Sequence, residues 1–128
     1  MPSTILHPDH YAALKSRLQP DRWLVVALCA DWCLTCKAYA APFAALAERY
    51  PDVEFIWADI EDESDFLHDP AIDNFPTLLI QRGADICFYG TVLPDVAVAA
   101  RLLDSCRSAP QTQDTSEAPN LYQLLQAV

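Results

Sequence analysis

The chain has 128 residues and a mass of 14.3 kDa, which is the size of one domain. Hydrophobic residues make up 52% of it and charged residues 20%, so a core can form, and a wholly disordered or fibrous chain is excluded. The 8 basic and 18 acidic side chains give a formal net charge of -10. Phosphate backbones and anionic lipid repel such a chain, so neither nucleic acid nor a membrane surface is an expected partner.

The first seven residues have neither the basic start nor the apolar run of a signal peptide. No stretch approaches the roughly 20 apolar residues of a spanning helix. The five cysteines are an odd number, which would leave one thiol unpaired in an oxidising compartment. Together these features predict a soluble cytoplasmic protein.

The first half of the chain alternates between helical and strand patterns. Apolar residues at helical spacing predict an amphipathic helix over 9–19. The continuous apolar run over 23–30 predicts a central strand buried on both faces. A helix follows between Cys33 and Pro51, and a second apolar run covers 53–60. This strand, helix, strand order predicts two parallel strands.

The second half begins with an acidic stretch, 59–69, which we interpret as a solvated loop. Two β-type runs, 77–81 and 85–89, are separated by a glycine-containing turn and predict an antiparallel hairpin. Helical spacing over 94–107 predicts the next helix. Residues 1–107 would then form one domain.

The polar composition of 108–119 predicts a linker. Beyond it, Asn120 can cap a short helix over 120–128, with its leucines on one face. So short a helix is marginal alone and must dock on something. It packs either on its own domain or on a partner, so the chain is a monomer or a weak homodimer through this helix.

Cys33 and Cys36 are the strongest chemical signal in the sequence. Two cysteines at i and i+3 where a helix begins lie on one turn, close enough for a disulfide. The N–H groups and dipole of the helix N-terminus stabilise a thiolate, which is the attacking species. We therefore expect Cys33 to be the exposed nucleophile and Cys36 the resolving thiol.

In the segment around these two cysteines and at two places further along, the chain resembles the thioredoxin superfamily. The matching residues are the run Ala30-Asp31-Trp32-Cys33-Leu34-Thr35-Cys36-Lys37 at a strand-to-helix junction, Phe75-Pro76-Thr77 at the opening of the next antiparallel strand, and Gly83 at the hairpin. The resemblance implies an α/β thioredoxin-like fold with a central mixed sheet of four to five strands flanked by helices. It also implies a cis Pro76 that faces the cysteines, with the backbone of Phe75 pairing with an extended substrate segment.

Three departures from the family pattern stand out. Leu34 and Thr35 replace the Gly-Pro of thioredoxins, and this looks closer to the C-terminal domain of bacterial transmembrane disulfide reductases. Ala27 and Trp57 occupy the places of a buried Asp and an accompanying Lys. Without that pair we expect Cys36 to lose its proton slowly, so that a mixed disulfide lives longer.

The other cysteines have plainer interpretations. Cys29 lies in a buried strand and is expected to be a small core residue, and Cys87 and Cys106 are expected to be structural. A structural zinc site needs four ligands and a single C-x-x-C supplies two, so we expect no metal. Trp32 is as compatible with packing as with contacting a substrate.

The predicted function is that of a thiol-disulfide oxidoreductase in which Cys33 and Cys36 act on protein disulfides, as a reductant. Substrate binding is assigned to Trp32, Phe75 and Pro76. No bound cofactor is expected, whereas an upstream thiol reductant or reductase is. Two alternatives stay open. One is a binding or assembly module with the same fold, and the other is a redox sensor without steady turnover.

Overall fold

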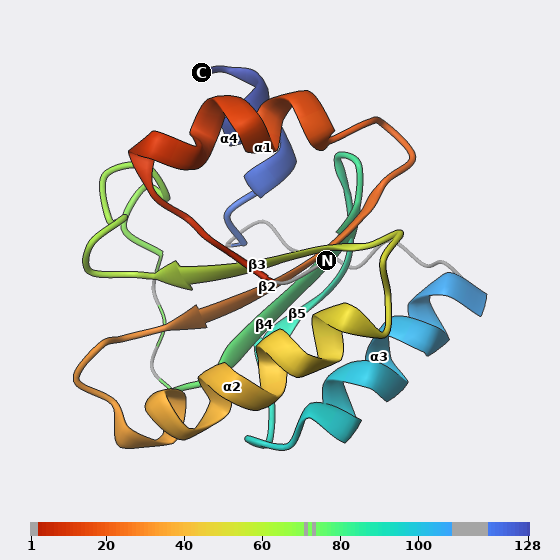
Figure 1. Ribbon diagram of the computed structural model, residues 1–128. Coiled ribbons are helices and arrows are strands. Elements are labelled where there is room, and N and C mark those ends of the chain that lie inside the picture. Colours follow the sequence, from red (N-terminus) through yellow and green to blue (C-terminus); the bar gives the residue numbers. More distant parts are fainter. Residues whose placement is uncertain (1–2, 71, 73, 109–117) are drawn as a thin grey trace.

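The computed structural model describes residues 3–70, 72, 74–108 and 118–128. Its five-stranded sheet has the order β1-β3-β2-β4-β5. Helices α1 and α4 cover one face of this sheet, and α2 and α3 cover the other (Figure 1). The strands are β1 (Thr4–Ile5), β2 (Trp23–Cys29), β3 (Glu54–Asp59), β4 (Thr77–Arg82) and β5 (Asp85–Thr91). The helices are η1 (Pro8–His10), α1 (Tyr11–Arg17), α2 (Leu34–Glu48), α3 (Val96–Ser108) and α4 (Leu121–Gln126).

Strand β2 lies at the centre of the sheet, as its continuous apolar run predicts. It pairs in parallel with β3 and antiparallel with β4. The β4–β5 hairpin is antiparallel, and its turn contains Gly83 at a φ of 50°. A Cβ atom at Gly83 would collide with the backbone of Pro20, so only glycine fits there. The predicted thioredoxin-like α/β arrangement is therefore confirmed.

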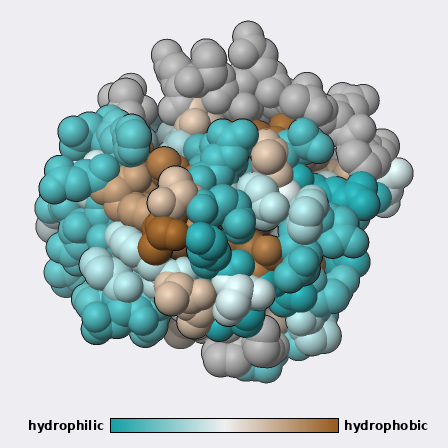
Figure 2. Space-filling model, turned by 90° about the horizontal axis from the view of Figure 1, so that it is seen from above, coloured by the Kyte–Doolittle hydropathy of each residue, from teal (hydrophilic) through white to brown (hydrophobic). Residues whose placement is uncertain are grey.

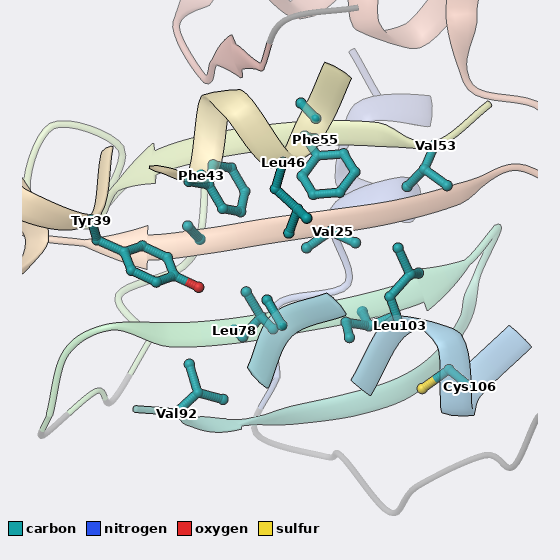
Figure 3. Close-up of a cluster of buried hydrophobic side chains, with 14 residues drawn as sticks. Val25, Tyr39, Phe43, Leu46, Val53, Phe55, Leu78, Val92, Leu103 and Cys106 are labelled. Carbon is teal, nitrogen blue, oxygen red and sulfur yellow. The ribbon is translucent and has the colours of Figure 1, made fainter. Parts of the chain in front are cut away.

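One core cluster fills the space between the sheet and the helices α2 and α3. Alternate residues of a strand point to the same face, so Val25 and Ala27 of β2 meet Phe43 and Leu46 of α2 there. Figure 3 shows Val25, Phe43 and Leu46 in this cluster, together with Leu103 of α3. Burial of such side chains contributes about 2 kcal/mol each. This packing fixes α2 over the end of β2, where the cysteines lie.

The second cluster, on the opposite face, includes the C-terminal helix. Leu121 and Leu125 of α4 are fully buried against this side of the sheet. Asn120 caps α4 by accepting a hydrogen bond from the Gln123 backbone N–H at 3.2 Å. Buried Gln81 donates to Asn120 Oδ1 and accepts from the Leu121 N–H, at 2.9 and 3.0 Å. The predicted cap is confirmed, and α4 docks on its own domain.

Two sequence-based expectations need correction here. The sequence patterns predict no strand before the first helix, but Thr4 and Ile5 form strand β1. This strand has only two residues and depends on pairing with distant β3. The acidic stretch is not a fully solvated loop. Glu63 is 5% exposed and accepts a 2.6 Å hydrogen bond from the Tyr11 hydroxyl, and Leu67 is buried in the core. The predicted 108–119 linker lies almost wholly outside the described residues.

The face formed by α1 and α4 is mainly hydrophilic, with smaller apolar areas between the polar side chains (Figure 2). Among the described residues, no helix combines the length and apolar character needed to cross a bilayer.

Candidate active site at the start of α2

Cys33 occupies the junction between β2 and α2. It is the N-cap of α2, with φ -85° and ψ 116°, and its thiol is free and half-buried. Its backbone N–H donates to the Ala30 carbonyl at 3.0 Å, while its carbonyl accepts from the Lys37 N–H at 3.1 Å. The backbone thus holds the thiol at the end of the helix where N–H groups have no partner within the helix.

Cys36 lies in the first turn of α2 and is 1% exposed. It forms a disulfide with Cys29, the last residue of β2, across a Cα–Cα distance of 5.9 Å. The interpretation of Cys29 as a simple core residue is therefore wrong. Cys29 is buried, and its side chain points to the face of the sheet that α2 covers, as do those of Ala27 and Val25, two and four residues earlier in the same strand. In this structure Cys36 is bonded to Cys29, and Cys33 keeps its thiol.

Trp32 and Leu34 flank Cys33 in the chain, and Trp32 contacts Phe75 of the segment before β4. The rings of Trp32 and Phe75 meet edge to face with centroids 5.6 Å apart. The bond between Phe75 and Pro76 is cis, and the Pro76 carbonyl accepts from the Val92 N–H at 3.1 Å. Three apolar side chains in these segments are largely exposed: Trp32 at 63%, Leu34 at 78% and Leu93 at 68%.

Cys36 lines a pocket of about 220 Å³, whose seven lining residues are Ala30, Asp31, Cys36, Lys37, Ala40, Trp57 and Asp59. Ala27 is fully buried and has no polar group to offer. The carboxyl groups in the pocket belong to Asp31 and Asp59. Asp59 is the register partner of Cys29 on neighbouring β3, and its Oδ1 accepts from the N–H groups of Glu61 and Asp62 at 2.8 and 3.1 Å.

Sequence reasoning missed Asp59 because it treated the residue as part of the acidic loop. The signal was present in the strand register. Parallel β2 and β3 both end at this edge of the sheet, so the last residue of each lies beside the start of α2. Asp59 is that residue in β3.

The family model for thioredoxin matches residues 6–97 of this chain. The chain belongs to the thioredoxin family. Thioredoxin H-type 2 of Nicotiana tabacum is 29% identical over 73 residues, covering 57% of this chain and 62% of the relative. Thioredoxin-1 of Saccharomyces cerevisiae is 31% identical over 65 residues, covering 51% and 63%.

Among solved structures, thioredoxin f2 in complex with ferredoxin:thioredoxin reductase has the same fold, with a TM-score of 0.68 at 19% identity. The match covers 83% of this chain and 96% of that one. In four plant and yeast thioredoxins that are similar in sequence, the matched segment covers only 38% to 63% of each relative's own length.

This member of the thioredoxin family has a second disulfide, which joins Cys87 of β5 to Cys106 of α3. The expectation that both residues are structural fits this position, away from Cys33. In the part of the chain that the structure describes, no group of three or more His, Cys, Asp or Glu could hold a metal ion.

Proposed function

We propose that this chain is a thiol-disulfide oxidoreductase that reduces disulfides in protein substrates. Cys33 thiolate attacks a client disulfide and forms a mixed disulfide, and one client cysteine leaves as a thiolate. The Cys36 thiolate then attacks Cys33, which releases the second client cysteine and leaves a Cys33–Cys36 bond. The client gains two electrons, and the cysteine pair loses two.

The observation that carries this proposal is the contrast between the two cysteines. Cys33 is half-buried at the N-cap of α2, and Cys36 is 1% exposed in the turn that follows. A client can therefore approach Cys33 but not Cys36. Such a division supports one cysteine as nucleophile and the other as resolving thiol, because the resolving attack is internal.

The proposed substrate surface consists of Trp32, Phe75 and Pro76. Exposed apolar side chains on Trp32 and Leu34 beside a reactive thiol favour an unfolded or extended client segment over a small polar thiol. Such a segment could add as a strand along the backbone of Phe75. This mode supplies main-chain hydrogen bonds to clients of many sequences.

The oxidised protein must be reduced before it can act again, and no bound cofactor is required for that. We propose a reductase or a small thiol as the electron source. The complex of thioredoxin f2 with ferredoxin:thioredoxin reductase gives a precedent for a reductase on this fold. The direction of electron flow, toward the client, is part of the proposal.

Insulin reduction by dithiothreitol, followed by turbidity, tests the proposal. We expect Cys33→Ser to abolish the acceleration and Cys36→Ser to accumulate a mixed disulfide. The matched control is Cys87→Ser, in a pair remote from the site, which should retain activity. A wild-type protein that does not accelerate the reaction would contradict the proposal. It would favour a binding module, whose partner affinity would survive Cys33→Ser, or a redox sensor, whose redox-dependent change of affinity would be lost in Cys33→Ser.

We propose a cytoplasmic monomer. The free Cys33 thiol supports a reducing compartment, whereas the Cys87–Cys106 disulfide is of a kind that persists in oxidising ones. Burial of Leu121 and Leu125 within their own domain leaves these side chains unavailable to a second copy. Microscopy of a tagged full-length chain tests the compartment, and sedimentation velocity tests the oligomeric state.

A further inference from the structure

Three of the five cysteines meet where β2 ends and α2 begins. Cys29 ends β2, Cys33 caps α2, and Cys36 lies in the first turn of α2. The structure joins Cys29 to Cys36 and leaves Cys33 as a thiol. The proposed function uses only Cys33 and Cys36, so the position of Cys29 needs its own explanation.

The backbone geometry allows Cys36 to pair with either neighbour. Its Cα lies 5.9 Å from that of Cys29, within the range of about 4.4–6.8 Å that a disulfide bridges. Cys33 and Cys36 are three residues apart where the helix begins, and side chains at that spacing are neighbours on a helix. Cys36 is therefore located between two possible sulfur partners.

We propose that Cys29 is a third catalytic cysteine and that Cys36 exchanges between Cys33 and Cys29. This inference rests on the proposed function, since it begins from the Cys33–Cys36 bond left by client reduction. Cys29 thiolate attacks the sulfur of Cys36, the Cys29–Cys36 bond forms, and Cys33 leaves as a thiolate. No electrons are gained or lost. The thiol proton of Cys29 passes to water or Asp59, and Cys33 takes one from solvent.

The position of Asp59 supports this proton route. It is the register partner of Cys29 and lines the same pocket as Cys36. A carboxylate beside a buried thiol can accept its proton, which the buried Ala27 side chain cannot.

The two oxidised forms differ in how an external reductant can reach them. In the Cys33–Cys36 form, the half-buried sulfur of Cys33 is open to attack. In the Cys29–Cys36 form, both sulfurs belong to residues that are only 1% exposed. Reduction of this second form then goes through Cys33, whose thiolate attacks Cys36 and expels Cys29. The exchange thus protects the oxidised site from direct attack by an external reductant, and the Cys33 thiolate becomes the group that reduces the Cys29–Cys36 bond.

Differential alkylation of the oxidised full chain tests this directly. Free thiols are labelled with one reagent after an acid quench, and the disulfides are then reduced and labelled with a second reagent. Tandem mass spectrometry of the tryptic peptide from Trp23 to Lys37, which contains all three cysteines, shows which residue was free. The first label on Cys33 reports a Cys29–Cys36 bond, and the first label on Cys29 reports a Cys33–Cys36 bond. We expect a population labelled first on Cys33.

Two variants give the rates. Oxidised Cys33→Ser should form the Cys29–Cys36 bond and lose it to dithiothreitol about tenfold more slowly than wild type, because the internal attack is missing. Oxidised Cys29→Ala, which has only the exposed bond, should be reduced faster than wild type. Circular dichroism verifies that each variant folds, and Cys29→Ser replaces Cys29→Ala if the latter does not.

Reduced Cys29 and Cys36 in oxidised Cys33→Ser, or first labels on Cys29 alone in the wild type, would overturn the inference. Insulin turnover separates this failure from that of the proposed function. If turnover needs Cys33 but no Cys29–Cys36 bond is found, the oxidoreductase stands and the exchange falls. If the bond is found without any turnover, the exchange is not part of catalysis, and both proposals fall.

Discussion

The indole N–H of Trp32 donates a hydrogen bond to the Glu61 carboxylate, with Nε1 and Oε1 2.7 Å apart. Both residues are exposed; Trp32 lies in the loop between β2 and α2, and Glu61 follows the end of β3. Trp32 also contacts Phe75 edge to face. The indole beside Cys33 is therefore held on two sides, which keeps it in place on the proposed substrate surface.

The first prediction concerns this hydrogen bond. Glu61→Ala should raise the KM for insulin about three-fold while kcat stays unchanged, because the hydrogen bond of an exposed indole contributes about 0.5–1.5 kcal/mol. Steady-state kinetics measure the split. Glu61→Gln keeps an acceptor and serves as the matched control. Equal KM values in Glu61→Ala and wild type would show that Trp32 does not need this acceptor.

The second prediction concerns Asp59 as a proton acceptor. Asp59→Asn should slow the resolution of a Cys33–client mixed disulfide by about tenfold or more, since it removes a general base from the pocket of Cys36. Rapid-quench trapping of the mixed disulfide measures this rate. Asp62→Asn, an exposed acid in the same loop, is the control. An unchanged rate in Asp59→Asn would contradict the assignment, and the proton would then pass to water or to Asp31, the other carboxyl group of the pocket.

The third prediction concerns a buried ion cluster at the opposite end of β3. Glu54 is 3% exposed and accepts from Arg17 and Arg22, each at 2.9 Å. Glu54→Gln should lower the free energy of unfolding by about 3 kcal/mol, because it leaves two guanidinium groups short of a counter-charge. Urea unfolding measures the change.

The control for Glu54 is an exposed ion pair in the same protein. Asp52 accepts from Arg107 at 2.7 Å, but its side chain is 60% exposed. Asp52→Asn should cost less than about 1 kcal/mol. If the two variants lose equal stability, burial is not what makes the Glu54 cluster important.

The fourth prediction concerns the Tyr39 hydroxyl. Its side chain is 2% exposed within the α2 side of the core (Figure 3), and no partner for its oxygen occurs among the described residues. Tyr39→Phe should raise the free energy of unfolding by up to about 1 kcal/mol, since it removes an unsatisfied polar group. Tyr50→Phe is the contrasting variant and should lower it, because Tyr50 donates to Asp104 at 3.0 Å. Thermal unfolding ranks the two, and a destabilised Tyr39→Phe would show that the hydroxyl is satisfied.

Tyr39 also predicts a pH dependence. Burial, followed by the nearby charge of Asp95, raises its pKa to about 12 in the folded chain. The folded state therefore binds this proton more tightly than the unfolded state, whose pKa is about 10. Its contribution to stability is complete below pH 10 and is lost as the pH rises toward 12. Tyr39→Phe should flatten the stability curve in this window.

The fold could be predicted from the sequence wherever one segment carried a strong pattern of its own. The apolar run of β2 and the helical spacing after Cys33 needed no knowledge of their neighbours. Strand β1 was missed because Thr4 and Ile5 become a strand only when β3 lies beside them.

The disulfides show the same limit more sharply. Five cysteines allow many pairings, and spacing alone favours the local pair Cys33 and Cys36. The Cys29–Cys36 and Cys87–Cys106 bonds depend on which helix covers which strand. Burial of Glu63 likewise depends on the Tyr11 hydroxyl from a distant helix. Local sequence located the reactive junction, but tertiary packing decides which sulfur atoms meet.

The docking of α4 has a practical consequence for orientation. Val128 lies beside α1, where its carbonyl accepts from the Lys15 ammonium at 2.8 Å, and the start of α2 is on the opposite face of the sheet (Figure 1). A linker attached at Val128, whether to a bead, an electrode or another protein, therefore extends from the face of the protein that carries α1. A chain immobilised there presents Cys33 to the solution, so thiol exchange can be followed on a surface without blocking the client.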